Sequence, residues 1–511
     1  MRKFGVAAMA ALLLCTGAAA ADDAAPNYLH WPVPPGAASY GAIDGHHLWQ
    51  YVVEQAGIAE RYRDAGHPQF WGRISGTSAD LEDAQWLIAK YKAAGLTDTR
   101  MQTVNYLAPQ WAPKSWSVAV AGGGRTLALS SAQPSYASPT TGGKELDLAL
   151  AYVGLGSEAD FQGRDVRGKA VLFVKSGLSR QIGPADIIKR AEANGAAAIL
   201  STDLRGANQT EQAYRAYTHV PSFLLGTKDA DAIRSMIAAA PANDPPHVKI
   251  TLDADFASGQ HSYLVWGTLP GMTDETIYVI AHRDGWFDAA GDNASGVASM
   301  LGLAEYFAKI PKSRRRRTMV FIGTDGHHSI RPGEFGNEWL LANRDRLFAK
   351  TALMINDEHP AEVAGHGGAA GTTTAMIPLE WYAGGDERPR LETITADAFH
   401  EFGVPLWTAP SKTPPAGDLG KFSWFLPGVV AQSNDFVAMH TTKDTPANVP
   451  WTGLEAVTRA YARIIDEVNR IPLNQLQRPA MDNPSAADTA ANVDLVRCAQ
   501  WVKDSTQGCA P

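Results

Sequence analysis

The alternation of strand-like and helix-like segments between residues 261 and 472 is the feature that most constrains the fold. Short apolar runs typical of buried strands are interleaved with longer helical patterns. In chain order, these are the strands 275–282, 318–323 and 351–356 and the helices 293–310, 337–348 and 453–471. Strands and helices that alternate in this way predict an α/β domain, in which helices sandwich a mostly parallel sheet.

A further part of this domain is expected from about residue 45 to 115. Residues 76–96 predict a helix that Thr77 and Asp80 cap and Gly95 ends. One face of the helix is apolar and carries Leu81, Ala84, Leu87, Ile88 and Tyr91. We therefore expect this face to pack against the main sheet.

The segment from about 116 to 260 has a different texture. Glycine-bounded apolar strands at 168–177 and 220–226 flank a helix that begins near Pro184. The segment contains no cluster of acid, base and nucleophile. The pattern predicts a small separate α/β unit, which we expect to pack over the cleft of the main domain without supplying a metal ligand.

The two ends of the chain predict an exported protein. Residues 1–21 have a basic start, an apolar stretch too short to cross a bilayer, and small residues suited to cleavage. No later segment is long and apolar enough to span a membrane. We therefore expect a secreted or periplasmic protein. In an oxidising compartment, Cys498 and Cys509 of the polar tail 473–511 would form a local disulfide.

Composition argues against some classes of partner. The chain has 511 residues, of which 45% are hydrophobic, and a net charge of -8. This balance is ordinary for a globular protein and argues against binding to nucleic acid. We expect the one basic run, Arg314–Arg317, to be a solvated loop before a strand.

Acidic and histidine residues gather where the predicted strands of the main domain end. They are His282, Asp284 and Asp292 after the first strand, His327 and His328 after the second, Asp357, Glu358 and His359 after the third, and His440 further on. Open α/β sheets bind ligands at the carboxyl ends of their strands, so these side chains are expected to meet in one cleft. Imidazole and carboxylate groups are the ligands that zinc takes in catalytic sites. The pattern therefore predicts a zinc site.

Two of the carboxylates have further expected roles. Asp292 lies between the clusters, where a carboxylate can bridge two ions about 3.5–4 Å apart. An Asp-Asn pair before a helix also serves as a helix cap, and Asp292 could do so here. Asp284 lies two residues past His282 and could accept a hydrogen bond from the second nitrogen of that ring.

Several motifs together resemble peptidase family twenty-eight, the zinc aminopeptidases and carboxypeptidases. The motifs are AHRDGWFDAAGDNASGVA from residue 281, RTMVFIGTDG from 317, NEWL from 337, MINDE from 354 and MHTTKDT from 439. The first is nearest to the glutamate carboxypeptidase branch, and NDEH is more similar to carboxypeptidase Q. The segment 168–226 resembles the protease-associated domain that this family carries as an insertion. The resemblance covers roughly residues 45–470.

The resemblance implies a phosphorylase/hydrolase-like fold with one or two zinc ions. By position, Asp292 would bridge the ions. His282 and Asp357 would complete one metal position. His328 and His440 would complete the other.

The metal ligand after the third predicted strand is open between two neighbouring residues, Asp357 and Glu358. An Asn-x-acid pattern would make Glu358 the ligand, whereas the carboxypeptidase Q form favours Asp357. Asp418, in GDLGKFSWFLPG, matches a stretch that helps to shape the pocket of the family.

His327 and His328 stand where the family has two adjacent glutamates. The match implies that His328 is a zinc ligand and that His327 is the general base, which takes a proton from the attacking water. A neutral imidazole with an ordinary pKa near 6.5 suits that task near neutral pH. Glu334, six residues past His328, is an alternative base.

The expected function is therefore that of an exported zinc-dependent exopeptidase, which hydrolyses peptide or amide bonds of small substrates. Aminopeptidase and carboxypeptidase activity both stay open, and the sequence does not predict an oligomeric state. The alternative is a non-catalytic relative that binds metal and acts as a binding protein, as the transferrin receptor keeps the fold without peptidase activity. A glutaminyl cyclase is a third possibility, which the inserted domain disfavours.

Overall fold

The computed structural model describes most of the chain between residues 30 and 476. The described ranges are 30–106, 109–175, 184–203, 208–214, 218–241, 243–329, 335–362, 380–384, 388–404, 418–422, 426, 429–433, 436 and 438–476. The predicted signal segment, Glu334, Cys498 and Cys509 lie outside them. No helix among the described residues is long and apolar enough to cross a membrane.

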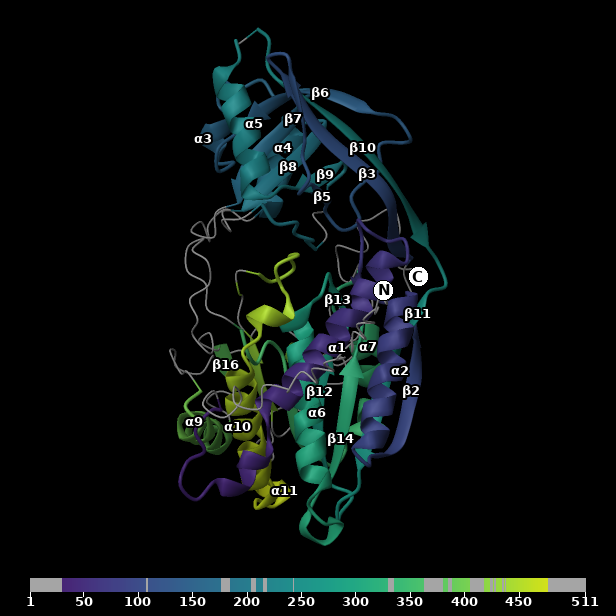
Figure 1. Ribbon diagram of the computed structural model, residues 1–511, viewed down its shortest axis with the longest axis vertical. Helices are drawn as coiled ribbons and strands as arrows, with labels where there is room; N and C mark the ends of the chain where they lie inside the picture. The colour runs from purple at the N-terminus through teal and green to yellow at the C-terminus, as the bar shows by residue number, and fades with distance from the viewer. Residues whose placement is uncertain are drawn as a thin grey trace, which may run out of the picture.

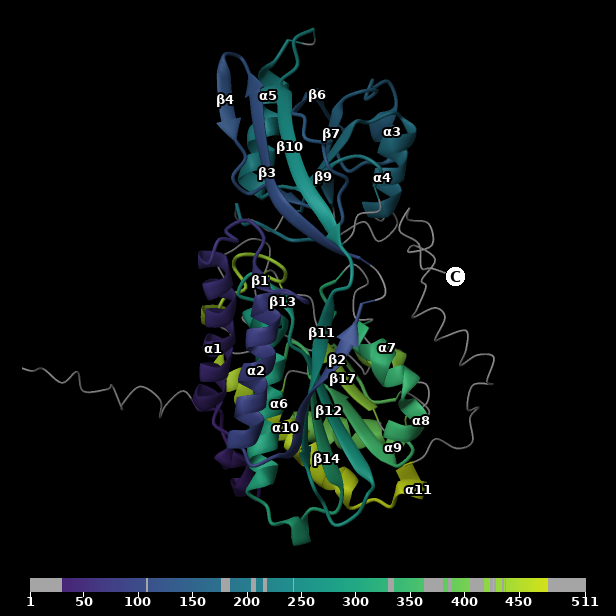
Figure 2. The same cartoon turned by 90° about the vertical axis from the view of Figure 1, so that its right-hand side faces the viewer.

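The main domain is built on a seven-stranded sheet (Figures 1 and 2). Its strands are, in spatial order, β16 (Glu380–Tyr382), β17 (Val429–Ser433), β15 (Thr351–Asn356), β12 (Thr276–His282), β14 (Thr318–Thr324), β11 (His261–Leu269) and β2 (Thr97–Asn105). The four central strands, β17, β15, β12 and β14, are parallel, and β11 and β16 run against them. The predicted α/β class with a mostly parallel sheet is confirmed.

Alternating residues of the central strands enter two different apolar cores. In β12, Ile277 and Val279 face the first core, and Tyr278 and Ile280 face the second. Successive side chains of a strand point to opposite faces, so a strand that is apolar throughout must be covered on both sides. This explains why residues 276–282 read as a continuous apolar run.

Helices supply both covers (Figure 2). The first core contains residues of α1 (Gly45–Asp64), α2 (Ser78–Ala93), α6 (Ser295–Ala308), α9 (Pro389–Glu401) and α10 (Trp451–Asn469). The second contains residues of α7 (Phe335–Ala342) and packs near α8 (Arg344–Leu347). A short helix, α11 (Leu473–Leu476), follows α10.

Helix α2 shows one difference from its predicted face. Thr77 caps it as expected, since its side chain accepts from the Asp80 amide, but Leu81 is 38% exposed. The buried face also includes Asp80 and Asp83, which pair with the buried Arg283. Leu81 lies outside the face that these ion pairs bury.

The basic run before β14 also differs from the expectation. Arg314 is exposed, but the side chain of Arg317 is fully buried. Its guanidinium donates to the carbonyl oxygens of Val468 and Ile471 and pairs with Glu275. The prediction of a solvated loop is therefore wrong for Arg317, because this arginine binds the carboxyl end of α10.

A second sheet of eight strands forms an inserted unit, which lies at the top of Figure 1. Its strands are, in spatial order, β4 (Arg125–Ala128), β3 (Gln110–Gly122), β10 (His247–Ala257), β6 (Leu146–Tyr152), β7 (Ala170–Lys175), β8 (Ala198–Asp203), β9 (Ser222–Leu224) and β5 (Gln133–Pro134). Its helices are α3 (Glu158–Phe161), α4 (Pro184–Ala193) and α5 (Thr227–Ala239). The long antiparallel pair β3 and β10 connects this unit to β2 and β11 of the main sheet, at residues 110 and 257.

Candidate metal centre

Four candidate ligand segments meet at one edge of the main sheet. His282 is the last residue of β12, and His328 follows the end of β14 by four residues. Glu358 and His359 follow β15. The parallel strands all end at this edge, so the loops that leave them are neighbours.

Asp292 lies at the centre of this arrangement. Its Oδ1 is 3.2 Å from Nε2 of His282 and 3.0 Å from Nε2 of His359. Its Oδ2 is 3.1 Å from Nε2 of His328 and 3.0 Å from Nε2 of His440. One carboxylate therefore has a pair of imidazole nitrogens at each of its oxygens.

The donor atoms suit two metal positions. Around a tetrahedral zinc ion, ligands at about 2.0–2.1 Å lie about 3.3 Å from one another. The Nε2 atoms of His328 and His440 are 3.2 Å apart, close to that spacing. On the other side, His282 Nε2, Asp292 Oδ1 and His359 Nε2 are buried, and no hydrogen bond to them is found in the described structure. These atoms fit a cation better than they fit one another.

We call the two groups the first and second metal positions. The first position has Asp292 Oδ1, His282 and His359, with Glu358 beside His282. The second has Asp292 Oδ2, His328 and His440. Such sets of imidazole and carboxylate ligands are typical of catalytic zinc.

Charge pairing holds the centre together electrostatically. Burial raises the pKa of Asp292, but His328 and His359 outweigh it and leave that pKa well below its ordinary value. Burial lowers the pKa of His282, and its carboxylate neighbours reverse the shift. The site therefore favours an ionised carboxylate surrounded by positive charge.

Asp284 orients two of the imidazole rings. Its carbonyl oxygen is 3.2 Å from Nδ1 of His282 and 3.2 Å from Nδ1 of His328. Its carboxylate accepts a hydrogen bond from the His328 amide at 2.6 Å. A ring that donates from Nδ1 presents the lone pair of Nε2 to a metal. The expected orienting role is thus mainly one of the Asp284 backbone, and it extends to His328.

Asp357 and Glu358 have different surroundings. Glu358 Oε1 is 3.7 Å from Nε2 of His282 and 3.7 Å from Nε2 of His327. Asp357 is buried and belongs to none of the candidate ligand groups found among the described residues. Burial raises the pKa of Asp357 well above its ordinary value. The geometry therefore favours Glu358 over Asp357 as the ligand in this segment.

His327 forms a pair with Asp418. Its Nδ1 is 3.1 Å from Oδ1 of Asp418, and its ring stacks on that of His282 at 4.1 Å. Asp418 also accepts from Thr324 and Asn337, so its carboxylate is held in place. His327 keeps 14% of its side chain exposed, whereas His282 has none. His327 is thus a ring that a substrate or water could reach.

A comparison with protein families finds a match over the segment that carries most of the candidate ligands. Residues 265–360, which contain β12, β14 and β15, match the profile of the family described as "Peptidase family M28". No curated protein is significantly similar to the chain.

Solved structures with a similar fold include zinc aminopeptidases. A zinc aminopeptidase from Bacillus subtilis has a TM-score of 0.59 at 17% identity, over 83% of this chain and 95% of that one. A peptidase M28 precursor from Shewanella amazonensis SB2B has a TM-score of 0.60 at 17% identity, over 83% and 96%. An aminopeptidase from an Aneurinibacillus strain has a TM-score of 0.51 at 16% identity, over 86% and 96%. At these identities, the likeness shows a shared fold.

Two acids that the sequence patterns did not single out lie beside the loop that carries Asp292. Asp444 accepts from the amides of Gly291 and Asp292 at 2.6 and 3.1 Å. Burial raises the pKa of Asp444 to about 7. Glu362 is fully buried beside Gly291, where an added Cβ would lie 1.4 Å from its Oε1. A larger residue at position 291 would therefore displace the Glu362 side chain. Asp444 belongs to the MHTTKDT motif, which could have indicated it.

The inserted unit reaches the candidate metal centre through Tyr214. Its ring lies 5.8 Å from that of His328 at an interplanar angle of 3°, and 5.0 Å from that of His440. Trp286 of the short strand β13 (Gly285–Trp286) packs against the same two rings. Among the described residues, no candidate ligand group includes a residue of 116–260. No pattern in the sequence pointed to Tyr214.

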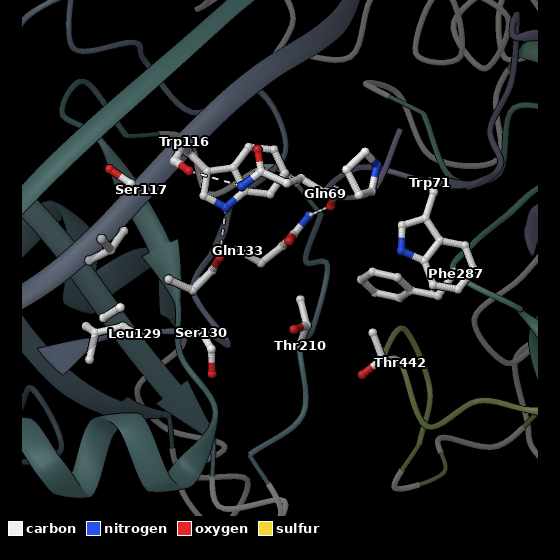
Figure 3. Close-up of a pocket in the computed structure, with 14 residues that line it drawn as sticks. Gln69, Trp71, Trp116, Ser117, Leu129, Ser130, Gln133, Thr210, Phe287 and Thr442 are labelled. Atoms are coloured by element: carbon white, nitrogen blue, oxygen red, sulfur yellow. Dashed lines mark hydrogen bonds between the residues drawn. The ribbon is translucent and has the colours of Figure 1, made fainter. Parts of the chain in front are cut away.

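A pocket of about 270 Å³ lies between the inserted unit and the main domain (Figure 3). It is walled by Trp71, Phe287 and Trp116, with Thr210 and Thr442 between them. The pocket contains no charged lining residue, so it is distinct from the metal centre. One lining residue, Thr442, lies two positions after His440 in the chain.

Proposed function

We propose that the protein is an exported zinc-dependent exopeptidase, which hydrolyses peptide or amide bonds of small substrates. One observation carries the proposal: both oxygens of Asp292 face a pair of imidazole nitrogens within an M28 segment. Zinc aminopeptidases of the same fold support the reaction class.

Each metal position has its own set of ligands in this proposal. Asp292 would serve both positions, His282 and His359 would hold the first ion with Glu358 beside them, and His328 and His440 would hold the second. Zinc in such sites polarises a carbonyl group and lowers the pKa of a water molecule. Asp357 is left out of the set, because Glu358 lies nearer to the rings.

His327 would act as the general base and acid, and Asp418 would orient it. Asp418 Oδ1 accepts from Nδ1 of His327, which leaves Nε2 as the basic nitrogen. Nε2 would take a proton from the attacking water and return it to the leaving amine. The held carboxylate fixes the ring and stabilises the positive charge that forms on it.

The cover over the site supports a small substrate. Tyr214 and Trp286 pack on one side of His328 and His440, and His440 keeps 12% of its side chain exposed. A long folded chain could not reach rings that are buried to this extent.

A metal-binding protein without catalysis is the second candidate. Its support is the third ligand group, His282, His327 and Glu358. If His327 binds a metal through Nε2, that nitrogen cannot accept a proton. The protein would then keep zinc and bind a ligand without hydrolysing it.

Metal content and turnover together test the proposal. The protein purified without chelator is expected to contain between one and two zinc ions per chain by elemental analysis. It should hydrolyse aminoacyl or N-capped dipeptide substrates from a panel. Chelation should lower its melting temperature, since zinc at a thousand times its Kd would stabilise the fold by about 4 kcal/mol.

The contrary results separate the candidates. A protein that contains no zinc and takes up none would contradict both. Bound zinc without turnover on any substrate of the panel would favour the binding protein. His261→Ala is a suitable control, because that histidine is exposed on β11 and contacts Tyr263.

Export is proposed from the sequence of residues 1–21, and it has a separate test. Expression with the natural start, followed by fractionation, should place the protein in the periplasm or medium. The new amino terminus should lie near residue 21. A cytoplasmic protein that keeps Met1 would contradict export and leave the metal centre unaffected.

A further inference from the structure

We propose that residues 208–214 of the inserted unit position His440, and that they thereby set the affinity of the second metal position. We call these residues the strap. The expected effect on zinc affinity rests on the proposed function. The expected effect on the position of His440 can be tested in the metal-free protein.

The strap pairs with the loop that carries His440. Glu211 and Thr441 form an antiparallel bridge. The Gln212 amide donates to the His440 carbonyl at 2.9 Å, and the Thr442 amide donates to the Thr210 carbonyl at 3.0 Å. The strap therefore extends this loop with the hydrogen bonds of a short two-stranded ladder.

The backbone of His440 needs such support. Its φ is 61°, in the left-handed region that residues other than glycine rarely adopt. A residue in this region costs free energy and persists where its surroundings hold it. The carbonyl that accepts from Gln212 belongs to His440 itself, so the hydrogen bond acts at the strained residue.

The strap is itself held firmly on its other side. Gln212 is fully buried, and its side-chain amide donates to the carbonyls of Pro134 and Ala213. Its side-chain oxygen accepts from Gln133 at 2.8 Å. The Tyr136 amide donates to the Ala213 carbonyl. These contacts join the strap to the edge of the inserted sheet. The position of His440 therefore depends on the inserted unit.

The end of the strap touches the imidazole rings directly. Tyr214 lies parallel to His328 and edge-on to His440, and it also packs against Trp286 at 5.1 Å. His328 and His440 are the two imidazole ligands of the second position. Tyr214 is thus a positioning residue, which limits how these rings can rotate away from Asp292.

Among the described residues, the strap forms no hydrogen bond or ring contact with the ligands of the first position. His282, Glu358 and His359 come from the ends of β12 and β15. His359 contacts Phe436 of the main domain. Loosening the strap should therefore weaken the second position selectively.

Hydrogen exchange of the metal-free protein tests the structural part. In Tyr214→Ala, amides of the strap and of residues 438–445 should exchange at least about tenfold faster than in the wild type. Tyr214→Phe keeps the ring and should exchange like the wild type. Tyr152→Ala is the matched control, since Tyr152 is a half-buried tyrosine of the same unit that packs against Arg234.

Zinc titration against a competing chelator tests the consequence. Tyr214→Ala should bind one of its two zinc ions about 10- to 100-fold more weakly, the usual effect of losing a residue that supports a ligand. The other ion should bind as in the wild type. Tyr214→Phe should restore the weakened affinity, which a general loss of folding stability would not explain.

The two measurements test the proposal separately. Unchanged hydrogen exchange in Tyr214→Ala would contradict the claim that the strap positions His440, whatever the zinc content. Faster exchange with unchanged affinity at both positions, or equal weakening at both, overturns its link to the second position. A wild-type protein that binds no zinc contradicts the proposed function, and exchange still decides whether the strap positions His440.

Discussion

The two metal positions differ in how the chain builds them. The first takes His282 and Glu358 from the ends of adjacent parallel strands, within three residues of the sheet. The second takes His440 from a loop that follows β17 by seven residues and pairs with the inserted unit. Both share the carboxylate of Asp292.

This difference separates ligands that a sheet places from ligands that packing places. Residues at a strand end inherit the position of a buried strand, which is stabilised by the whole core. A residue in a longer loop has more conformations to lose, so it needs partners of its own. The inserted unit supplies those partners to His440. Variants at the shared, second, first and outer residues can test this division.

The largest effect is expected at the shared residue. Asp292→Asn removes the negative charge that both positions share and leaves an amide oxygen for only one of them. Each zinc ion supplies several kcal/mol of transition-state stabilisation, so turnover should fall by at least about 10⁴-fold. Elemental analysis should find both ions reduced. Retention of one ion at wild-type affinity would show that Asp292 does not bridge.

A pair of single-ligand variants sharpens the comparison. His440→Ala and Glu358→Ala should each reduce turnover by about 10³-fold, because each removes a ligand from one position. Adding Tyr214→Ala to His440→Ala should leave the affinity for the remaining zinc ion unchanged, whereas adding it to Glu358→Ala should weaken that affinity. If the two double variants lose the same affinity relative to their parent variants, the strap serves both positions.

A variant of the proposed base should separate chemistry from metal binding. His327→Ala is expected to keep its zinc and lower turnover by about 10²- to 10⁴-fold, the usual contribution of a general base. Steady-state kinetics with elemental analysis measures both. Loss of zinc instead would identify His327 as a ligand of the first position and favour the binding protein. Turnover like that of the wild type would exclude His327 as the base.

The smallest effect is expected outside both positions. Burial raises the pKa of Asp288 to about 6, and one of its carboxylate oxygens has no hydrogen bond in the described structure. The folded state therefore holds a proton that the unfolded state releases, and stability falls as pH rises from about 4 to 6. Because Asp288 is partly exposed, loss of this proton should lower the free energy of unfolding by only about 1 kcal/mol.

Asp288→Asn should remove this part of the pH dependence. Relative to the wild type, the variant should gain stability of about 1 kcal/mol between pH 4 and pH 7 in thermal unfolding of the metal-free protein. Zinc content should not change. Parallel stability curves for the two proteins would contradict the raised pKa.

Much of the fold could be predicted from local patterns. The apolar runs at 275–282 and 318–323 predicted buried strands, and the pattern of 453–471 predicted the helix α10. Apolar residues recur along α10 at helical spacing and are buried, namely Leu454, Val457, Tyr461, Ile465 and Val468. These predictions succeeded because a strand covered on both faces is a continuous apolar run, whereas a helix buried on one face has an apolar period.

Charged residues limited the same approach. Arg317 looked like a member of a solvated run, and Leu81 like a member of an apolar face. Their environments depend on Val468 and Arg283, which are far away in the chain. A sequence period does not report such partners.

The sequence by itself determined that acids and histidines stand at the ends of parallel strands. This follows because strand direction sets the edge at which His282, Asp292 and His328 lie. Only the tertiary structure decided how they divide into two positions. The choice of Glu358 over Asp357 and the contact of Tyr214 depend on side-chain directions and on packing between units, which local sequence does not encode.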